Sequence, residues 1–213
     1  MLCEVKQTVN ALHAAFELFN ADGALGDALF PDNFLFGGPC VCHYRQSEFV
    51  LCYRPASPGR NLFRGAEDRA WVPYSIAMNG EPCGWICEKE QSSGFFSRFS
   101  YSFMELFETE YEMYRVGLGK DGIVYPIFVK GRQVAQIEKP TVVRNNLDEY
   151  KLCSLNEEAQ RAAVLLCLYL DARAFAHRGQ IARSSVEKTF FLTTNKTLKA
   201  KYDPNFHARA AQM

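Results

Sequence analysis

Residues 125–137 read YPIFVKGRQVAQI, and this segment carries the clearest structural signal in the chain. Apolar side chains recur at alternate positions around Lys130-Gly131, a pattern that places one face of a strand in a core. The glycine supplies the positive φ that a tight hairpin turn requires. The segment therefore predicts two antiparallel strands joined at Lys130-Gly131.

Two further segments repeat this pattern. Tyr74–Ile86 aligns with Tyr125–Ile137 without a gap, because the turn glycines coincide and Glu-Lys follows shortly after both segments. Phe16–Leu29 has the same form around Asp22-Gly23. All three segments are typical of β-hairpins.

Other strands are expected between and after these hairpins. Their ranges are rich in β-branched and aromatic residues, and they are Cys40–Tyr44, Glu48–Tyr53, Arg98–Leu106, Glu110–Val116 and 187–194. The loops at 55–60 and 91–94 are too short to be domain linkers. We therefore expect residues 1–213 to form a single domain.

One helix is expected, over about residues 156–178. Asn156 is a suitable N-cap, Glu157 and Glu158 favour the first turn, and Gly179 is suited to the C-terminus. From Ala162 to Leu170 no face is polar, and a helix that is apolar all round is usually buried all round. The sequence thus predicts an α+β, mostly antiparallel β protein in which a closed barrel wraps around a central helix. Residues 180–213 would form a C-terminal extension.

Residues 114–175 resemble the tubby C-terminal-like superfamily, which includes LURP-one-related proteins and phospholipid scramblases. The resemblance rests on short motifs, which are Gly117–Gly122, Tyr125–Gly131, Val134–Lys139, Asn146–Tyr150 and the late apolar helix ending Tyr169-Leu170-Asp171. It implies a barrel of about twelve strands threaded by a hydrophobic helix. It also implies membrane association, since tubby proteins bind phosphoinositides. The extension after Gly179 departs from the family pattern, and no lipid-binding residue carries over individually.

Charge and hydropathy limit the expected partners and cellular location of the protein. Lys+Arg and Asp+Glu both total 24, so no global basic excess favours nucleic acid. The N-terminus has no basic region followed by an apolar one, which argues against a secretory signal. The most apolar window, Ala159–Ala176, is interrupted by charged residues and predicts no transmembrane span. We expect a cytoplasmic protein, peripheral to the membrane if it binds lipid, with reduced cysteines.

Two motifs suggest chemistry that their context does not favour. Gly117–Gly122 fits G-x-G-x-x-G, but β-branched residues and a proline follow where a dinucleotide site needs a helix, so we interpret it as a turn. Cys40, Cys42 and His43, with Cys83 and Cys87, could hold zinc. Their C-x-C and C-x-x-x-C spacings differ from the usual knuckle, so buried cysteines are the better interpretation and no metal or cofactor is expected.

No catalytic motif is evident. The histidines at positions 13, 43, 177 and 207 lie in no recognisable nucleophile motif, and the carboxylates between Glu105 and Glu112 are more typical of a solvated strand face. A hydrolase whose site is assembled from residues distant in sequence stays an alternative.

Basic residues around the third hairpin are the candidate ligand-binding site. They are Lys120, Lys130, Arg132 and Lys139, with Arg144 nearby. Such a cluster could bind a phosphate headgroup through charge-assisted hydrogen bonds. The sequence therefore favours a non-enzymatic binding or regulatory module for anionic lipid headgroups. The alternative is a protein–protein interaction module that uses the extension, whose basic residues are Lys196, Lys199, Lys201 and Arg209.

Overall fold

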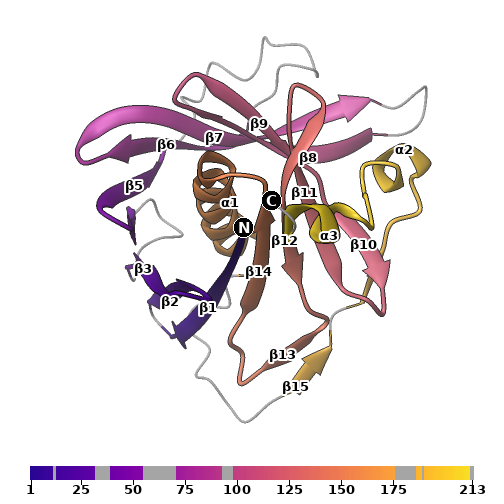
Figure 1. Cartoon of the computed structure of the whole chain (residues 1–213), viewed down its shortest axis with the longest axis horizontal. Helices are drawn as coiled ribbons and strands as arrows, with labels where there is room; N and C mark the ends of the chain where they lie inside the picture. The colour runs from indigo at the N-terminus through magenta and orange to yellow at the C-terminus, as the bar shows by residue number, and fades with distance from the viewer. Residues whose placement is uncertain are drawn as a thin grey trace.

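The computed structural model describes residues 1–11, 13–31, 39–54, 71–92, 98–175, 186–188 and 190–211. Most of these residues lie in antiparallel strands (Figure 1). The strands are β1 Leu2–Asn10, β2 Ala14–Asn20, β3 Gly23–Phe30, β4 Cys40–Tyr44, β5 Ser47–Tyr53, β6 Trp71–Met78, β7 Glu81–Ser92, β8 Arg98–Leu106, β9 Thr109–Met113, β10 Val116–Gly119, β11 Ile123–Val129, β12 Arg132–Lys139, β13 Val142–Arg144, β14 Glu149–Ser154, β15 Val186–Lys188 and β16 Phe191–Leu192.

The three hairpins predicted from the repeated pattern are confirmed as β2–β3, β6–β7 and β11–β12. Their turns use positive φ angles, among them 51° at Asn79 and 49° at Lys130. The strands expected at Cys40–Tyr44 and Glu48–Tyr53 are confirmed as β4 and β5, which form a hairpin whose turn has φ of 55° at Arg45. Local turn chemistry thus fixes the register of most of the sheet.

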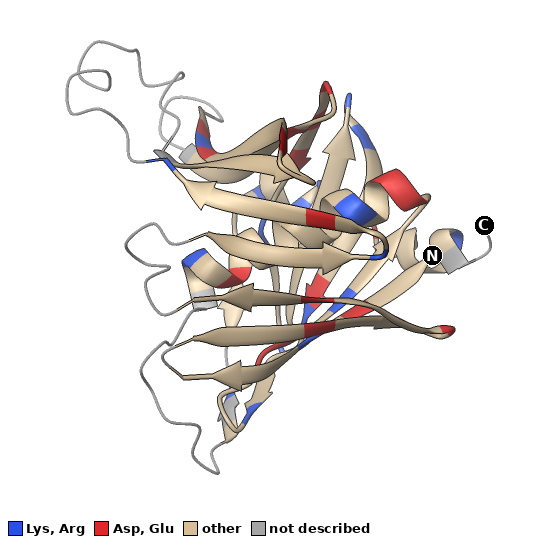
Figure 2. Ribbon diagram, turned by 90° about the vertical axis from the view of Figure 1, so that its left-hand side faces the viewer, with Lys and Arg blue, Asp and Glu red and all other residues tan. Residues whose placement is uncertain are grey.

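The sheet closes into a barrel of twelve antiparallel strands, β1–β9, β11, β12 and β14. Closure depends on β14, which pairs on one side with β1 from the other end of the chain, where Leu2 faces Cys153, and on the other side with β12, where Ala135 faces Ser154. Figure 2 shows acidic and basic positions spread over several outer strands. A closed barrel leaves none of these twelve strands with an unpaired edge.

The strand expected at Glu110–Val116 is interrupted. β9 pairs with the second half of β11, β10 pairs with its first half, and Tyr114-Arg115 separates them. The interpretation of Gly117–Gly122 as a turn needs correction, because Gly117–Gly119 belong to β10 and the turn occupies residues 120–122. A strand follows that turn, so the context of a dinucleotide site is absent there.

The apolar helix is α1, Glu157–Leu170, and Asn156 caps it by accepting a hydrogen bond of 2.8 Å from the Ala159 amide. Every residue from Ala162 to Leu170 is buried, and α1 contacts β8, β12 and β14. The α-helix ends earlier than expected, because Asp171–Phe175 form a π-helical turn. The rest of the expected range, with His177 and Gly179, lies outside the described residues.

The extension is packed against the barrel. The strand expected at 187–194 is two short strands: β15 pairs with β13, and β16 pairs with β10. Two helices follow, α2 Lys196–Lys199 and α3 Phe206–Ala211. Phe206 and Ala210 of α3 are buried against Cys153 of β14. The extension is therefore an integral layer on one side of the barrel.

Candidate functional site

The predicted basic cluster does not form one surface. In the β11–β12 hairpin Val129 faces Arg132 at one end, and Ile123 faces Lys139 at the other. With a rise of about 3.3 Å per residue, these ends are roughly 20 Å apart. Lys130 and Arg132 therefore lie at the opposite end of the hairpin from Lys139, and the turn that holds Lys120 adjoins the Lys139 end.

Lys139 is buried rather than free for a headgroup. Its ammonium forms an ion pair with Asp148, and their side chains are 1% and 4% exposed. The backbone amide of Asp148 donates to Gln7 Oε1 at 3.0 Å, which ties the pair to β1. Lys139 also lines a surface pocket that carries four carboxylates, Glu4, Asp121, Glu138 and Glu149, and two further lysines, Lys6 and Lys151. The four negative charges outnumber the three positive ones, which disfavours an anionic ligand beside Lys139.

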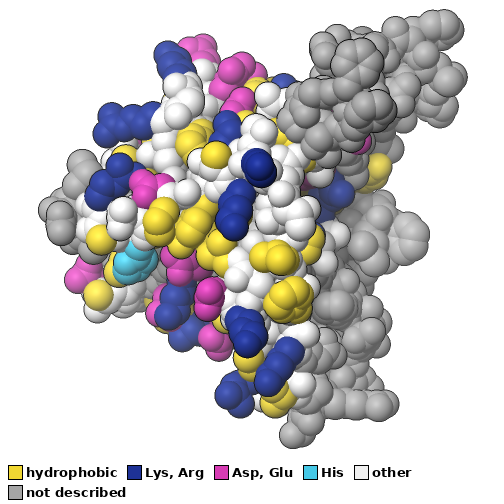
Figure 3. Space-filling view, turned by 90° about the vertical axis from the view of Figure 1, so that its right-hand side faces the viewer, with side chains coloured by type: hydrophobic (Ala, Val, Ile, Leu, Met, Phe, Trp, Pro, Cys, Tyr) yellow, Lys and Arg dark blue, Asp and Glu magenta, His cyan; other side chains and the backbone are white. Residues whose placement is uncertain are grey.

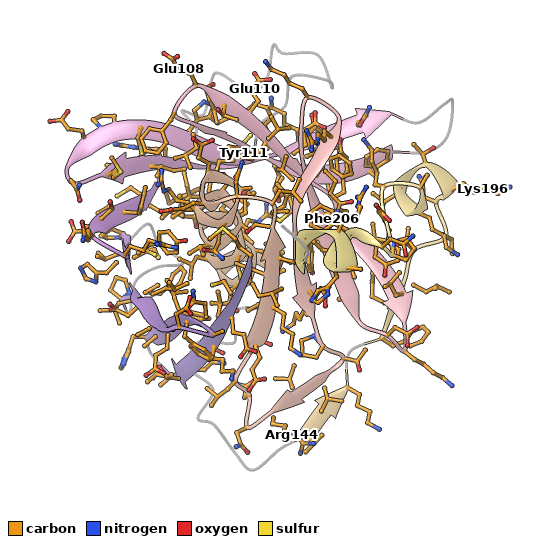
Figure 4. All side chains as sticks on the ribbon, in the orientation of Figure 1. Glu108, Glu110, Tyr111, Arg144, Lys196 and Phe206 are labelled. Atoms are coloured by element: carbon orange, nitrogen blue, oxygen red, sulfur yellow. The ribbon has the colours of Figure 1, made fainter. Side chains whose placement is uncertain are left out.

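A different basic surface is formed by the extension together with β13 and the turn after β10, next to which it lies. We call it the β15–α2 surface, and it comprises Lys120, Arg144, Val186, Lys188, Phe190, Leu192, Lys196 and Lys199. Strand pairing holds it in place, since Arg144 faces Val186 and Leu118 faces Leu192. Figure 4 shows Arg144 beside β13 and β15 and Lys196 on α2, at the two ends of this surface.

Large apolar side chains of this surface face solvent. Phe190 is 67% exposed, Val186 60% and Leu192 54%. Figure 3 shows Lys and Arg side chains interspersed with hydrophobic ones on this side of the molecule. Exposed apolar residues among cations are typical of a surface that meets an anionic, partly apolar partner.

The barrel supports this surface closely. Phe191 points inward between its exposed neighbours, and the Arg115 guanidinium lies 4.0 Å from the centre of its ring. The Gly117 amide donates to Thr193 Oγ1 at 2.8 Å. A Cβ at Gly117 would lie 2.2 Å from the Phe191 carbonyl oxygen, so glycine is needed for the approach of β16. The exposed side chains of Phe190 and Leu192 are therefore held in place by the packing of β16 against β10.

The four basic residues of the extension have different surroundings. Lys196 and Lys199 are exposed. The Lys201 ammonium lies 4.3 Å from the centre of the Tyr114 ring, and Arg209 is ion-paired with Asp203. Of these four residues, Lys196 and Lys199 are the two that are exposed and have no ion pair within the described ranges.

The apolar half of this surface was not predicted from the sequence, in which Phe190-Phe191-Leu192 is typical of an ordinary strand segment. The available signal was a run of three large apolar residues between Lys188 and Lys196, in a short edge strand where alternate side chains face out.

The cysteines considered for zinc are separated by strands. Cys40 and Cys42 are buried on β4, whereas Cys83 and Cys87 lie on β7, with β5 and β6 between. Within the described ranges, no group of three or more His, Cys, Asp or Glu side chains is placed to hold a metal ion.

Thiol accessibility gives a direct check of this burial. Burial raises the pKa of Cys3 and of Cys87 to about 12, so both stay protonated at pH 8. In native protein at pH 8 we expect a disulfide reagent such as DTNB to react with no more than Cys52 and Cys83, which are partly exposed. All eight thiols should react in denaturant. Rapid reaction of a third thiol in the native state would contradict the described core.

The histidines with described side chains do not assemble a nucleophile. His43 Nδ1 lies 3.2 Å from Asp27, and its Nε2 lies 3.4 Å from Glu48. These residues face one another across β3, β4 and β5, and about half of each side chain is exposed. The arrangement is a cross-strand charge ladder on the outside of the barrel.

No protein-family model matches the sequence, and neither a curated protein nor a solved structure matches it. Within the described ranges, no helix combines the length and apolar composition that crossing a membrane requires.

Proposed function

We propose that the protein is a non-enzymatic peripheral module whose β15–α2 surface binds anionic lipid headgroups at a cytoplasmic membrane face. The observation that carries this proposal is the exposure of Phe190 and Leu192 among Lys120, Lys188, Lys196 and Lys199. Each lysine near an anionic bilayer contributes about 1 kcal/mol. Burying a Phe or Leu side chain fully contributes about 1.5–3 kcal/mol. The attraction of the lysines to anionic headgroups and the insertion of Phe190 and Leu192 into the bilayer together account for reversible binding to a membrane.

The architecture supports the family part of the proposal. A closed barrel of twelve strands followed by a buried apolar helix is the arrangement that the resemblance to tubby-like proteins implies. We infer that α1 runs through the middle of the barrel, since it contacts β8 as well as β12 and β14 and its side chains are buried on every face. On this proposal residues 1–213 form one tubby-like domain, and the extension provides the lipid-facing layer.

The proposal predicts vesicle binding that depends on charge. Purified protein should co-sediment with phosphatidylcholine vesicles that contain phosphatidylserine or a phosphoinositide, and not with phosphatidylcholine alone. Binding should weaken from low to physiological salt, because dissolved ions screen the attraction between the lysines and the anionic headgroups. Lys196→Glu with Lys199→Glu should reduce binding at least tenfold. Phe190→Ser with Leu192→Ser should reduce it by a similar factor at either salt concentration.

A matched control lies at the far end of the β11–β12 hairpin. Lys130→Glu with Arg132→Glu makes the same change in charge at two exposed positions and should leave binding nearly unchanged. If this pair abolishes binding instead, the headgroup site lies at that hairpin. If wild-type protein binds none of the vesicles, the lipid proposal fails, and a protein partner becomes the account of the exposed apolar surface.

A further inference from the structure

A polar pocket of about 170 Å³ lies where α1 ends against β7, β8, β9 and β11. Its polar lining comes from Glu88, Ser100, Tyr101, Ser102, Arg115, Tyr125 and Arg173. Its apolar lining is Met113, Leu170 and Ala174. The pocket is separate from the β15–α2 surface, although Arg115 borders both.

Two donors in this pocket lack partners. Tyr125 is 1% exposed, and within the described ranges neither its hydroxyl nor the Nε of Arg115 has a hydrogen-bond partner. Burial raises the pKa of Tyr125 and keeps the phenol protonated, and the nearby charge of Arg115 opposes this rise only in part. Buried donors are nearly always satisfied in native proteins, so two unsatisfied ones at one pocket indicate a missing acceptor.

The charges of the pocket leave Arg115 as its net positive centre. Arg173 forms an ion pair with Glu88 at 3.5 Å, and Ser102 donates to the same carboxylate at 2.7 Å. Arg115 has no carboxylate partner within the described ranges, and its guanidinium lies over the ring of Phe191. Because Glu88 and Arg173 neutralise each other, the lining carries one uncompensated positive charge.

We propose that this pocket binds a small monocarboxylate, with its oxygens on the Arg115 guanidinium and the Tyr125 hydroxyl. A guanidinium offers a planar set of donors that matches the two oxygens of a carboxylate. A ligand with one negative charge would neutralise the uncompensated positive charge of Arg115. Met113, Leu170 and Ala174 provide the surface for a short alkyl chain. The ligand class is therefore a short-chain carboxylic acid in its ionised form.

Butyrate tests the proposal against its neutral analogue, butyramide, and against inorganic phosphate. With the ionic strength held constant by chloride, butyrate should bind saturably in calorimetry and raise the midpoint of thermal unfolding. Butyramide should do neither. If only phosphate binds, the site takes a different oxyanion and the carboxylate assignment is wrong. If no probe binds, water satisfies the pocket and the proposal is wrong.

The Tyr125→Phe variant tests whether the unpaired Tyr125 hydroxyl serves to bind a ligand or is only an unfavourable feature of the fold. Without ligand it should be at least as stable as wild type, because it removes a buried hydroxyl that has no partner. With butyrate it should lose at least tenfold in affinity, and Arg115→Gln should lose more. If Arg115→Gln does not fold, Tyr125→Phe still decides the matter. Wild-type butyrate affinity in Tyr125→Phe would overturn the proposal.

Tyr44→Phe is the matched control. The Tyr44 hydroxyl is also buried, but it donates to Gln160 Oε1 at 2.8 Å. Its removal should lower the unfolding temperature and leave the affinity for butyrate unchanged. A loss of butyrate affinity in this variant would show that the effect of Tyr125→Phe is not local.

Discussion

Leu166→Asp is expected to abolish soluble folding. Leu166 lies in the middle of α1 and has no exposed surface, and its neighbours from Ala162 to Leu170 are also buried. An unpaired carboxylate there costs several kcal/mol for desolvation, and the lost leucine packing adds about 2–5 kcal/mol. The sum is comparable with the whole stability of a domain, about 5–15 kcal/mol. The measurement is soluble yield followed by thermal unfolding monitored by circular dichroism.

Leu166→Met is the volume-matched control for this variant. It keeps the side chain apolar and should cost less than about 1.5 kcal/mol, so the protein should stay soluble and melt cooperatively. A Leu166→Asp protein that is soluble and melts cooperatively would show that water reaches this face of α1. The inference that α1 runs through the barrel would then be wrong.

Lys139→Met is expected to destabilise the protein by about 3–5 kcal/mol, because it leaves Asp148 buried without its ion-pair partner. Urea unfolding of wild type and variant gives the difference in free energy. Lys151→Met on β14 is the control, since Lys151 is exposed and its removal should cost no more than about 0.5 kcal/mol.

The double variant Lys139→Met with Asp148→Leu completes the cycle. Replacing both charges by apolar groups is often close to neutral, so the double variant should be more stable than Lys139→Met alone. Asp148→Leu alone gives the second single loss. If the loss of stability in the double variant equals the sum of the two single losses, the pair does not interact, and the burial of Lys139 needs another cause.

The hairpins were predictable because their signals are local. Asn79-Gly80 and Lys130-Gly131 combine turn residues with flanking apolar alternation, and both turns formed where the pattern placed them. The start of α1 was equally local, since Asn156 and the two following glutamates mark it. Short-range chemistry therefore predicted most of the barrel wall.

The strands that close the barrel were not predictable in the same way. β1 has buried polar positions at Gln7 and Asn10, which break the apolar alternation. β14 is six residues long, and the Asn145-Asn146 turn before it pairs Arg144 with Leu147 rather than pairing two strands of the barrel. Their mutual pairing joins residues about 150 positions apart. A local pattern cannot carry that information.

The same limit affected the candidate site. Lys130 and Lys139 were grouped because both lie near one hairpin in the sequence. In the structure the length of β12 separates them. The partner of Lys139 became visible only when β12, β14 and β1 were placed together. Arg115 lies in no motif, and Tyr125 was interpreted only as a position of the hairpin, because the sequence does not show that their donors lack partners.

The pairing of β1 with β14 also sets an order of events during translation. β1 can pair with β2 as soon as that strand leaves the ribosome, but its other edge must wait until Ser154 has been made. The apolar α1 is made after β14, so the core residues that pack against it stay uncovered until late in synthesis. Partly made chains thus carry an open β edge and uncovered core residues, which are the features that recruit chaperones. The long separation of paired strands also makes refolding slow compared with that of a helical bundle of similar size.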